Sequence, residues 1–222
     1  MGSPNVSRWS LFLLLVAPVC GADVCHPTPD GLPDRAYLTQ CRPEPVSREE
    51  KAAVLQTLPR QGAITVFSPA QRAKLDAVNQ VLHVHGRENV YEVRLIDIPQ
   101  AWTGLHGRAV LLVSVPMLEI LSAAELQALV AHEVGHEYLF REYEAAHFAG
   151  DNARVRDVEA ACDAIAVLTL AQLGIPAARL ANAIEKVYWY NRSRFGVALN
   201  ESSYPTLKQR RRLIAEFSRR TR

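Results

Sequence analysis

The sequence lacks any apolar run of the length that a membrane-spanning helix needs, which is about 20 residues. It also lacks an excess of one charge, because 25 Lys and Arg residues are balanced by 23 Asp and Glu residues, for a formal net charge of +2. A balance so close to neutral gives no reason to expect nucleic acid as a partner. Internal repeats, low-complexity tracts and long linkers are absent too. The 222 residues, 49% of them hydrophobic, therefore suit a single domain with a substantial core.

Cysteine is scarce, with 4 residues in the whole chain. Cys25 and Cys41 flank a loop that contains Pro and Gly, and a disulfide between them would restrain an otherwise loose segment. Two free thiols are the alternative, which an oxidising compartment disfavours. Cys162 lies far from both, in a helical pattern, and has no evident partner.

The first 22 residues have the pattern of an export signal. Arg8 precedes Leu11–Val19, which is apolar apart from one proline, and small residues then offer a cleavage site before Asp23. An uncleaved membrane anchor is one alternative, although the run is short for a span, and lipidation at Cys20 is another. We expect residues 1–22 to direct export, to a bacterial periplasm, and to be removed.

The remaining chain divides into an irregular leader and one domain. Residues 23–46 are rich in Pro, Asp and Gly and show no periodicity, so we expect a leader there and a single domain over residues 47–222. Ser47 and Ser122 begin Ser-x-x-Glu patterns that cap helices, and Ser68 precedes a proline at a helix start. The patterns predict helices over about residues 47–58, 68–82, 122–147, 152–173, 176–189 and from 205 onward, and strands over 63–67, 90–98 and 108–115. This content indicates a mainly helical α+β fold with a small β-sheet.

Residues 108–115 form the most strand-like run of the chain, and Pro116 ends it. An exposed edge strand at this place would let an extended substrate add to the sheet as a further strand. A plain core strand is equally supported, because the run is apolar almost throughout. Residues 99–107 and 191–203 are predicted loops.

A His-Glu-x-x-His pattern lies at His132, Glu133 and His136, inside a predicted helix. Residues four apart lie on the same face of a helix, so the two histidines can bind one metal ion and Glu133 can act on a water molecule beside it. The alternative is an ordinary amphipathic helix with a few polar residues. The helix is otherwise apolar, however, and these polar side chains would need partners when buried. Gly135 would leave space for substrate or metal beside the ligands.

A third ligand is available on the next predicted helix. Glu159 lies 159 − 136 = 23 residues after His136, which is enough for one helix to end and another to return antiparallel. Asp163 lies four residues later on the same face, where it can accept a hydrogen bond from a ligand histidine. The alternative is that both carboxylates form salt bridges with Arg154 and Arg156 on a solvated surface.

These residues resemble a family of zinc enzymes. His-Glu-Val-Gly-His at 132–136, followed by Glu-x-x-x-Asp at 159–163, is similar to the gluzincin metallopeptidases typified by HtpX, the CAAX prenyl protease and BepA-like periplasmic relatives. The resemblance extends over about residues 90–212 and includes the lead-in Ser122–Leu126 and a closing segment, Tyr204–Arg210. It implies a zincin-like metallopeptidase fold, with the small sheet beside the helix that carries the histidines.

The resemblance also implies a role for each site residue. One zinc ion per chain would be held by His132, His136 and Glu159, with Glu133 as the catalytic base and Asp163 as the support of a ligand histidine. The membrane helices of HtpX and the prenyl protease have no counterpart here, as in the soluble periplasmic members.

Three positions need separate interpretation. Cys162 stands where the family usually has Ala and is similar to BlaR-type sensor metallopeptidases. Tyr204 stands where the family often has His, and it could stabilise an oxyanion or merely pack. Arg210 matches the family's arginine, whose role by position is structural or substrate-facing.

We predict an exported, zinc-dependent endopeptidase that acts on protein or peptide substrates, in envelope protein quality control as relatives do. One alternative is a zinc-stabilised chaperone-like or binding module with little or no proteolysis, and another is a sensor peptidase that cuts one regulatory partner. The basic residues of 208–222 could attract an anionic membrane surface, although a solvated helix face is the more frequent explanation.

Overall fold

A computed structural model of the chain describes residues 36–58, 63–64, 66–196 and 203–221. Within these ranges the chain is mainly helical with one small sheet, so the predicted α+β class is confirmed. The predicted export signal at residues 1–22 lies outside the described residues. None of the described helices is both long and apolar enough to span a membrane.

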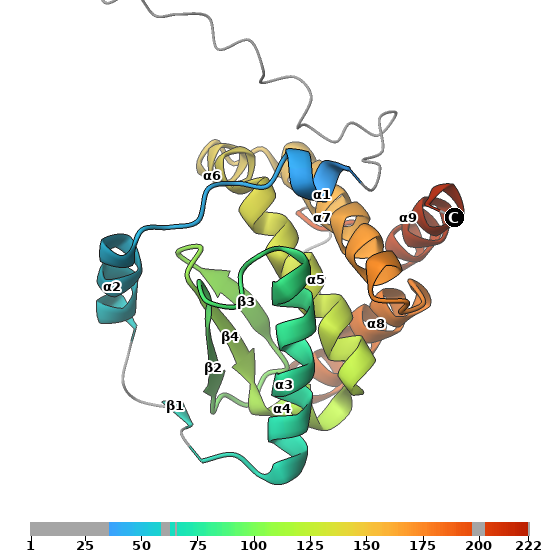
Figure 1. Ribbon diagram of the computed structural model, residues 1–222. Coiled ribbons are helices and arrows are strands. Elements are labelled where there is room, and N and C mark those ends of the chain that lie inside the picture. The colour runs from blue at the N-terminus through green and yellow to red at the C-terminus, as the bar shows by residue number, and fades with distance from the viewer. Residues whose placement is uncertain (1–35, 59–62, 65, 197–202, 222) are drawn as a thin grey trace, which may run out of the picture.

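The sheet has four strands in the order β1-β2-β4-β3 (Figure 1). β2 (Glu92–Ile96) and β4 (Val110–Ser114) are parallel to each other. β1 (Ala63–Ile64) is antiparallel to β2, and β3 (Thr103–His106) is antiparallel to β4. All three predicted strands are therefore present, each with shorter bounds than the sequence suggested.

The position of β4 decides between the two interpretations of residues 108–115. β4 is hydrogen-bonded to a strand on each side and four of its five residues are buried, so residues 108–115 hold a core strand and not an edge strand. The edge next to β4 belongs to β3, which lies inside the segment 99–107 that we predicted to be a loop. Thr-Gly-Leu-His is too short and too polar to stand out in the sequence, and its pairing with β4 makes it a strand.

The N-terminal part of the described chain holds three helices. α2 (Arg48–Thr57) and α3 (Pro69–Val84) begin at the predicted caps. α1 (Tyr37–Gln40) was not predicted, because it lies in the segment that we expected to be irregular. Its first two residues are buried in a small apolar cluster with residues of α7, and the Tyr138 hydroxyl donates a hydrogen bond to the Leu38 carbonyl at 3.0 Å. Residues 37 and 38 are therefore packed against the domain.

The central helix is α5 (Ala123–Tyr138), which starts at the predicted capping box on Ser122. The helical pattern that we expected to run to residue 147 is interrupted at Leu139, after which α6 (Phe140–Phe148) follows as a separate helix. The sequence also did not predict α4 (Val115–Ile120), which has a proline in its first turn.

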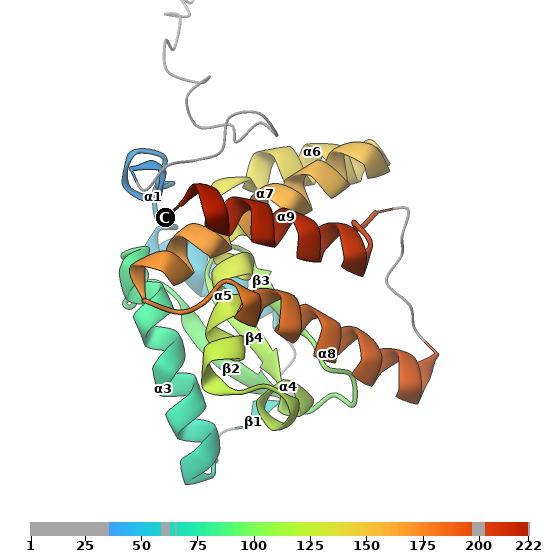
Figure 2. The ribbon, with the colours of Figure 1, turned by 90° about the vertical axis from the view of Figure 1, so that its right-hand side faces the viewer.

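Three further helices cover the side of α5 that faces away from the sheet: α7 (Asn152–Gln172), α8 (Ala178–Phe195) and α9 (Leu207–Arg220). Figure 2 shows α8 and α9 in front of α5, with the sheet behind it. α8 extends beyond the predicted end at residue 189 to residue 195, and therefore includes the first residues of the predicted loop 191–203. α5 therefore contacts the sheet on one side and the helical layer on the other.

Gly135 determines how closely α5 and α7 approach each other. A Cβ atom at this position would lie 3.0 Å from the Cys162 Cα atom and 3.1 Å from its Cβ atom. We expected Gly135 to leave space for substrate or metal, and this expectation was wrong: the space is filled by the neighbouring helix. The close approach brings the face of α5 that carries the histidines against α7.

Candidate metal centre

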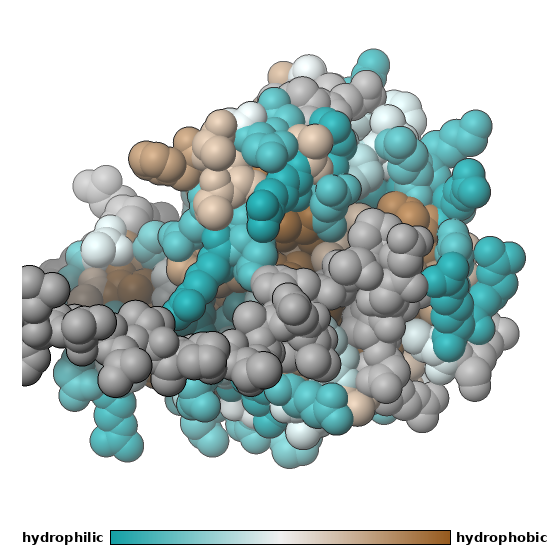
Figure 3. All heavy atoms as spheres, turned by 90° about the horizontal axis from the view of Figure 1, so that it is seen from above, coloured by the Kyte–Doolittle hydropathy of each residue, from teal (hydrophilic) through white to brown (hydrophobic). Residues whose placement is uncertain are grey.

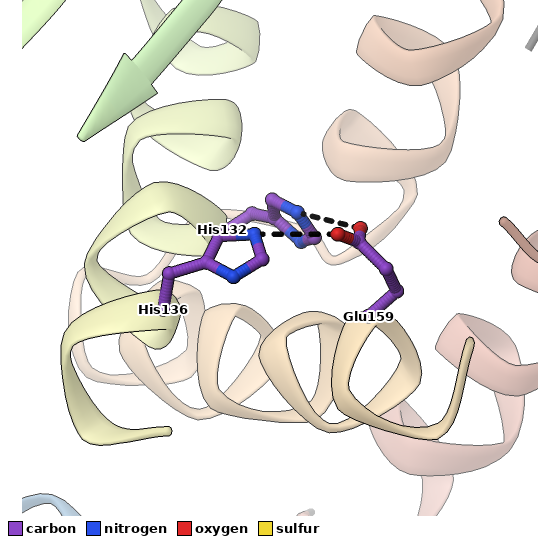
Figure 4. Close-up of side chains that lie close together, drawn as sticks. All are labelled: His132, His136 and Glu159. Carbon is purple, nitrogen blue, oxygen red and sulfur yellow. Dashed lines mark ion pairs between the residues drawn. The ribbon is translucent and has the colours of Figure 1, made fainter. Parts of the chain in front are cut away.

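Two imidazoles and one carboxylate converge between α5 and α7 (Figure 4). The Nε2 atom of His132 lies 3.3 Å from Glu159 Oε2, and the Nε2 atom of His136 lies 3.5 Å from Glu159 Oε1. One potential ligand atom from each residue lies within 4.8 Å of the other two. The three residues therefore form a group that could hold a metal ion, as the sequence predicted.

The ring of His132 is held from behind by Asp163 on α7. Its Nδ1 atom lies 2.9 Å from Asp163 Oδ1, which leaves Nε2 directed toward Glu159. The Nε atom of Arg210, from α9, donates to Asp163 Oδ2 at 2.8 Å. Burial opposes the charge on Asp163, but the Arg210 cation and the His132 hydrogen bond outweigh it and lower the pKa of Asp163 to about 2. A carboxylate that is charged and fixed in this way orients the histidine.

Electrostatics distinguish the two histidines of the centre. Burial disfavours the imidazolium of His132, but hydrogen bonds with Asp163 and Glu159 raise its pKa to about 10. Burial lowers the pKa of His136 to about 4 in spite of Glu159. Among the described residues, His136 Nδ1 has no hydrogen-bond partner although it is buried. The pair thus has one tightly held ring and one ring with fewer partners.

Glu133 lies beside this group and is half-buried. Burial raises the pKa of its carboxyl to about 7, and the negative charge of Glu159 adds to this effect. Leu105, on the edge strand β3, lines the same cavity as Glu133. A carboxyl with a pKa near neutrality can both accept and return a proton.

The centre opens into a cavity of about 1110 Å³. β3 forms one wall, and α6 contributes another on which Phe148 is 96% exposed. Figure 3 views the molecule from above, the side of α6 in Figure 1, and shows hydrophobic residues among hydrophilic ones there. The apolar part of the cavity wall includes Ala101, Trp102, Leu105, Met117, Leu129, Phe140, Ile184 and Val187.

The other predicted residues are placed as follows. Tyr204 lines the cavity and is half-buried. Arg210 is only 6% exposed and bonds Asp163, so it does not belong to a basic outer face of α9. The two carboxylates thus interact with the histidines and with Arg210, not with the arginines of α7 that the alternative interpretation required. Cys41 is disulfide-bonded. Cys25, the partner that the sequence suggested, lies outside the described residues, so the pairing of these two cysteines stays a prediction. Cys162 is a buried free thiol.

Sequence reasoning missed Tyr143 and Trp102, both of which line the cavity. The Tyr143 ring on α6 lies edge-on to the His136 ring, with 5.0 Å between their centroids, and stacks on His147 at 5.9 Å. Its distance of seven residues from His136 was the available signal, because that spacing favours the same side of a helical stretch. For Trp102 the sequence holds no such signal.

Comparison of the chain with protein families and with curated proteins finds no match. The chemistry of the site therefore has to be argued from its own residues. Two imidazole nitrogens and one carboxylate oxygen bind several divalent metals, and three protein ligands leave a coordination position open.

Proposed function

We propose that the protein is a zinc-dependent endopeptidase. The observation that carries the proposal is the position of Glu133, a carboxyl beside a three-residue ligand group at the wall of an open cavity. Two histidines and one glutamate suit zinc in a catalytic site, whereas structural zinc sites are commonly closed by four protein ligands. A purely structural site would have no use for a base in this place.

Each residue of the group has a distinct task in this proposal. When bound, zinc supplies a Lewis acid that activates water and polarises a carbonyl group. Glu133 accepts the proton that the attacking water loses and passes it to the nitrogen of the leaving amine. Asp163, itself held by Arg210, keeps the His132 ring in the orientation that binding requires.

The cavity supports an extended polypeptide as the substrate. β3 is one of the two terminal strands of the sheet and lies at the cavity wall, so a substrate segment could pair with its outer edge as a further strand. The apolar walls would accept hydrophobic side chains, which unfolded proteins expose. Together with the signal-like N-terminus, this favours an exported enzyme that removes misfolded envelope proteins.

The test compares Glu133→Gln with the wild type and with Glu119→Gln, which makes the same change at an exposed position on α4. We expect the wild type and Glu119→Gln to cleave unfolded casein, a chelator to abolish the cleavage, and Glu133→Gln to retain zinc but lose activity. Turnover that survives in Glu133→Gln would contradict the proposal. A wild type that binds zinc and casein without cleavage would indicate the binding module instead.

A further inference from the structure

Asn191 on α8 bonds the backbone at the point where the chain enters β3, and the mechanism above does not use it. The backbone N–H of Ala101 donates to Asn191 Oδ1 at 2.9 Å, and Asn191 Nδ2 donates to the Ala101 carbonyl at 2.8 Å. A side-chain amide has both an acceptor and a donor, so it can bond both polar groups of one backbone residue. A neighbouring strand would bond that residue in the same pattern. Asn191 therefore takes the place of a strand beside Ala101.

The register of the sheet determines which carbonyls of this segment face outward. The backbone N–H of Ser114 donates to the Trp102 carbonyl at 2.9 Å, so this carbonyl is directed toward β4. Because carbonyls alternate in direction along a strand, those of Ala101, Thr103 and Leu105 are directed away from β4. The first of these three accepts the hydrogen bond from α8. The carbonyls of Thr103 and Leu105 are left for a substrate on the outer edge.

The turn after β3 limits the same edge at its other end. Gly107 and Arg108 have φ angles of 54° and 55°, so the chain leaves the extended conformation directly after His106. The His106 ring is hydrogen-bonded to the Thr57 hydroxyl of α2 at 3.1 Å, which holds the end of the strand. The pairing edge of β3 therefore lies between α8 on one side and this turn on the other.

Asn191 also fixes the position of this edge relative to the metal centre. It lines the cavity together with Glu133 and residues 101–105. α8, which carries it, packs against α5, the helix that carries the histidines. Ala101 is only 1% exposed, and the loss of Asn191 would leave two of its buried backbone groups without partners. One side-chain amide thus connects the start of β3 to the helices around the centre.

We propose that Asn191 is a positioning residue for the substrate: it closes the outer edge of β3 at Ala101 and fixes the edge beyond it, so that an extended polypeptide pairs through Thr103 and Leu105 alone. The inference rests on the proposed function for its ligand, a polypeptide that adds to β3 as a strand. A bound chain then has two backbone N–H groups, two residues apart, that donate to β3. Recognition through the backbone therefore needs only a short extended stretch of the substrate.

The test is a backbone methylation scan of a bound peptide. Fluorescence anisotropy measures the affinity of zinc-loaded Glu133→Gln for a fluorescein-labelled casein peptide and for copies that each carry one N-methylated peptide bond. Loss of one hydrogen bond lowers affinity by about five- to tenfold. We expect this loss at two positions of the peptide, two residues apart, whichever direction the peptide runs. A third sensitive position in step with these two, or no sensitive position, would overturn the proposal.

Addition of Asn191→Ala to Glu133→Gln distinguishes positioning from packing. The unmodified peptide should bind about five- to tenfold more weakly, because the Thr103 carbonyl is no longer held in place. The methylated position that pairs with Thr103 should then have no further effect, to within about twofold, since both changes remove the same hydrogen bond. If the losses multiply at both sensitive positions, the positioning role is overturned. Asn182→Ala makes the same change at a half-buried position of α8 outside the cavity, and should keep both sensitive positions.

A second variant guards against loss of the fold, which the urea midpoint and the zinc content report. Asn191→Asp keeps the acceptor for the Ala101 N–H but loses the donor to the Ala101 carbonyl, so it should abolish the same sensitive position. This inference and the proposed function fail separately. Two sensitive positions without casein cleavage by the wild type would overturn the peptidase and support the pairing. Casein cleavage with three sensitive positions would overturn the pairing and leave the peptidase in place.

Discussion

Replacing Asp163 with asparagine tests the centre most directly, because this residue supports both the metal site and the fold. The Asp163 side chain is fully buried and bonds His132 on one side and Arg210 on the other. Asp163→Asn keeps the shape but removes the charge, so the buried Arg210 cation loses its partner. Breaking a buried ion pair in this way costs about 3–5 kcal/mol. We expect the free energy of unfolding of the metal-free protein to fall by this order.

The same substitution should weaken metal binding through His132. Loss of a carboxylate that orients a ligand histidine lowers metal affinity by about 10- to 100-fold. The assay is a zinc titration in competition with a chromophoric chelator, combined with urea unfolding of the metal-free protein. Asp157→Asn, an exposed change on the same helix, is the matched control.

A second variant separates charge from shape. Arg210→Met added to Asp163→Asn removes the unpaired cation, so the double variant should be more stable than Asp163→Asn alone. The reasoning fails if Asp163→Asn binds zinc as tightly as the wild type. It also fails if the free energy of unfolding of the double variant falls by as much as those of the two single variants added together.

Three further predictions concern other parts of the molecule. Glu159→Ala should lower the zinc content measured by elemental analysis, and an unchanged content would remove this residue from the ligand group. Gly135→Val should force α5 away from α7 and lower the free energy of unfolding by about 1–3 kcal/mol in a thermal or urea melt; a neutral effect would contradict the packing argument. His85 is buried. Burial, and then the charges of Arg42 and Arg87, lower the pKa of its imidazole from 6.5 to about 3. Keeping the ring neutral therefore stabilises the fold fully above pH 6.5, and this stabilisation is lost as the pH falls toward 3. Between pH 7 and pH 5 the free energy of unfolding of the wild type should fall by about 2 kcal/mol more than that of His85→Gln. Equal decreases in urea titrations would refute this.

The histidine pair of the ligand group was predictable because it depends on a local rule. The spacing of His132 and His136 follows from the helical repeat, and the caps at Ser47, Ser68 and Ser122 fixed where helices begin. The remaining features depend on contacts between distant segments. β3 is a strand only because β4 lies beside it, and β4 is central only because β2 lies on its other side.

Arg210 and Gly135 illustrate the same limit at the level of side chains. Arg210 lies in a basic run that predicts a solvent-exposed helix face. Its side chain is buried, however, and bonds the Asp163 carboxylate, 47 residues earlier in the chain. Gly135 lies between two site residues in the sequence, which suggested a place for substrate, but its neighbour is the backbone of α7. In both cases the deciding partner is on another helix, and the sequence does not show which helix that is.

The packing of α1 has a consequence for the order of events during synthesis. Tyr37 and Leu38 are buried against α7, and the Leu38 carbonyl is bonded by a hydroxyl 100 residues later. Most of the residues that bury α1 emerge from the ribosome about a hundred or more positions after it. The N-terminal segment is therefore the first described part of the chain to be made and among the last that can find its place. A chain whose synthesis has not yet reached α7 would carry this segment unpacked.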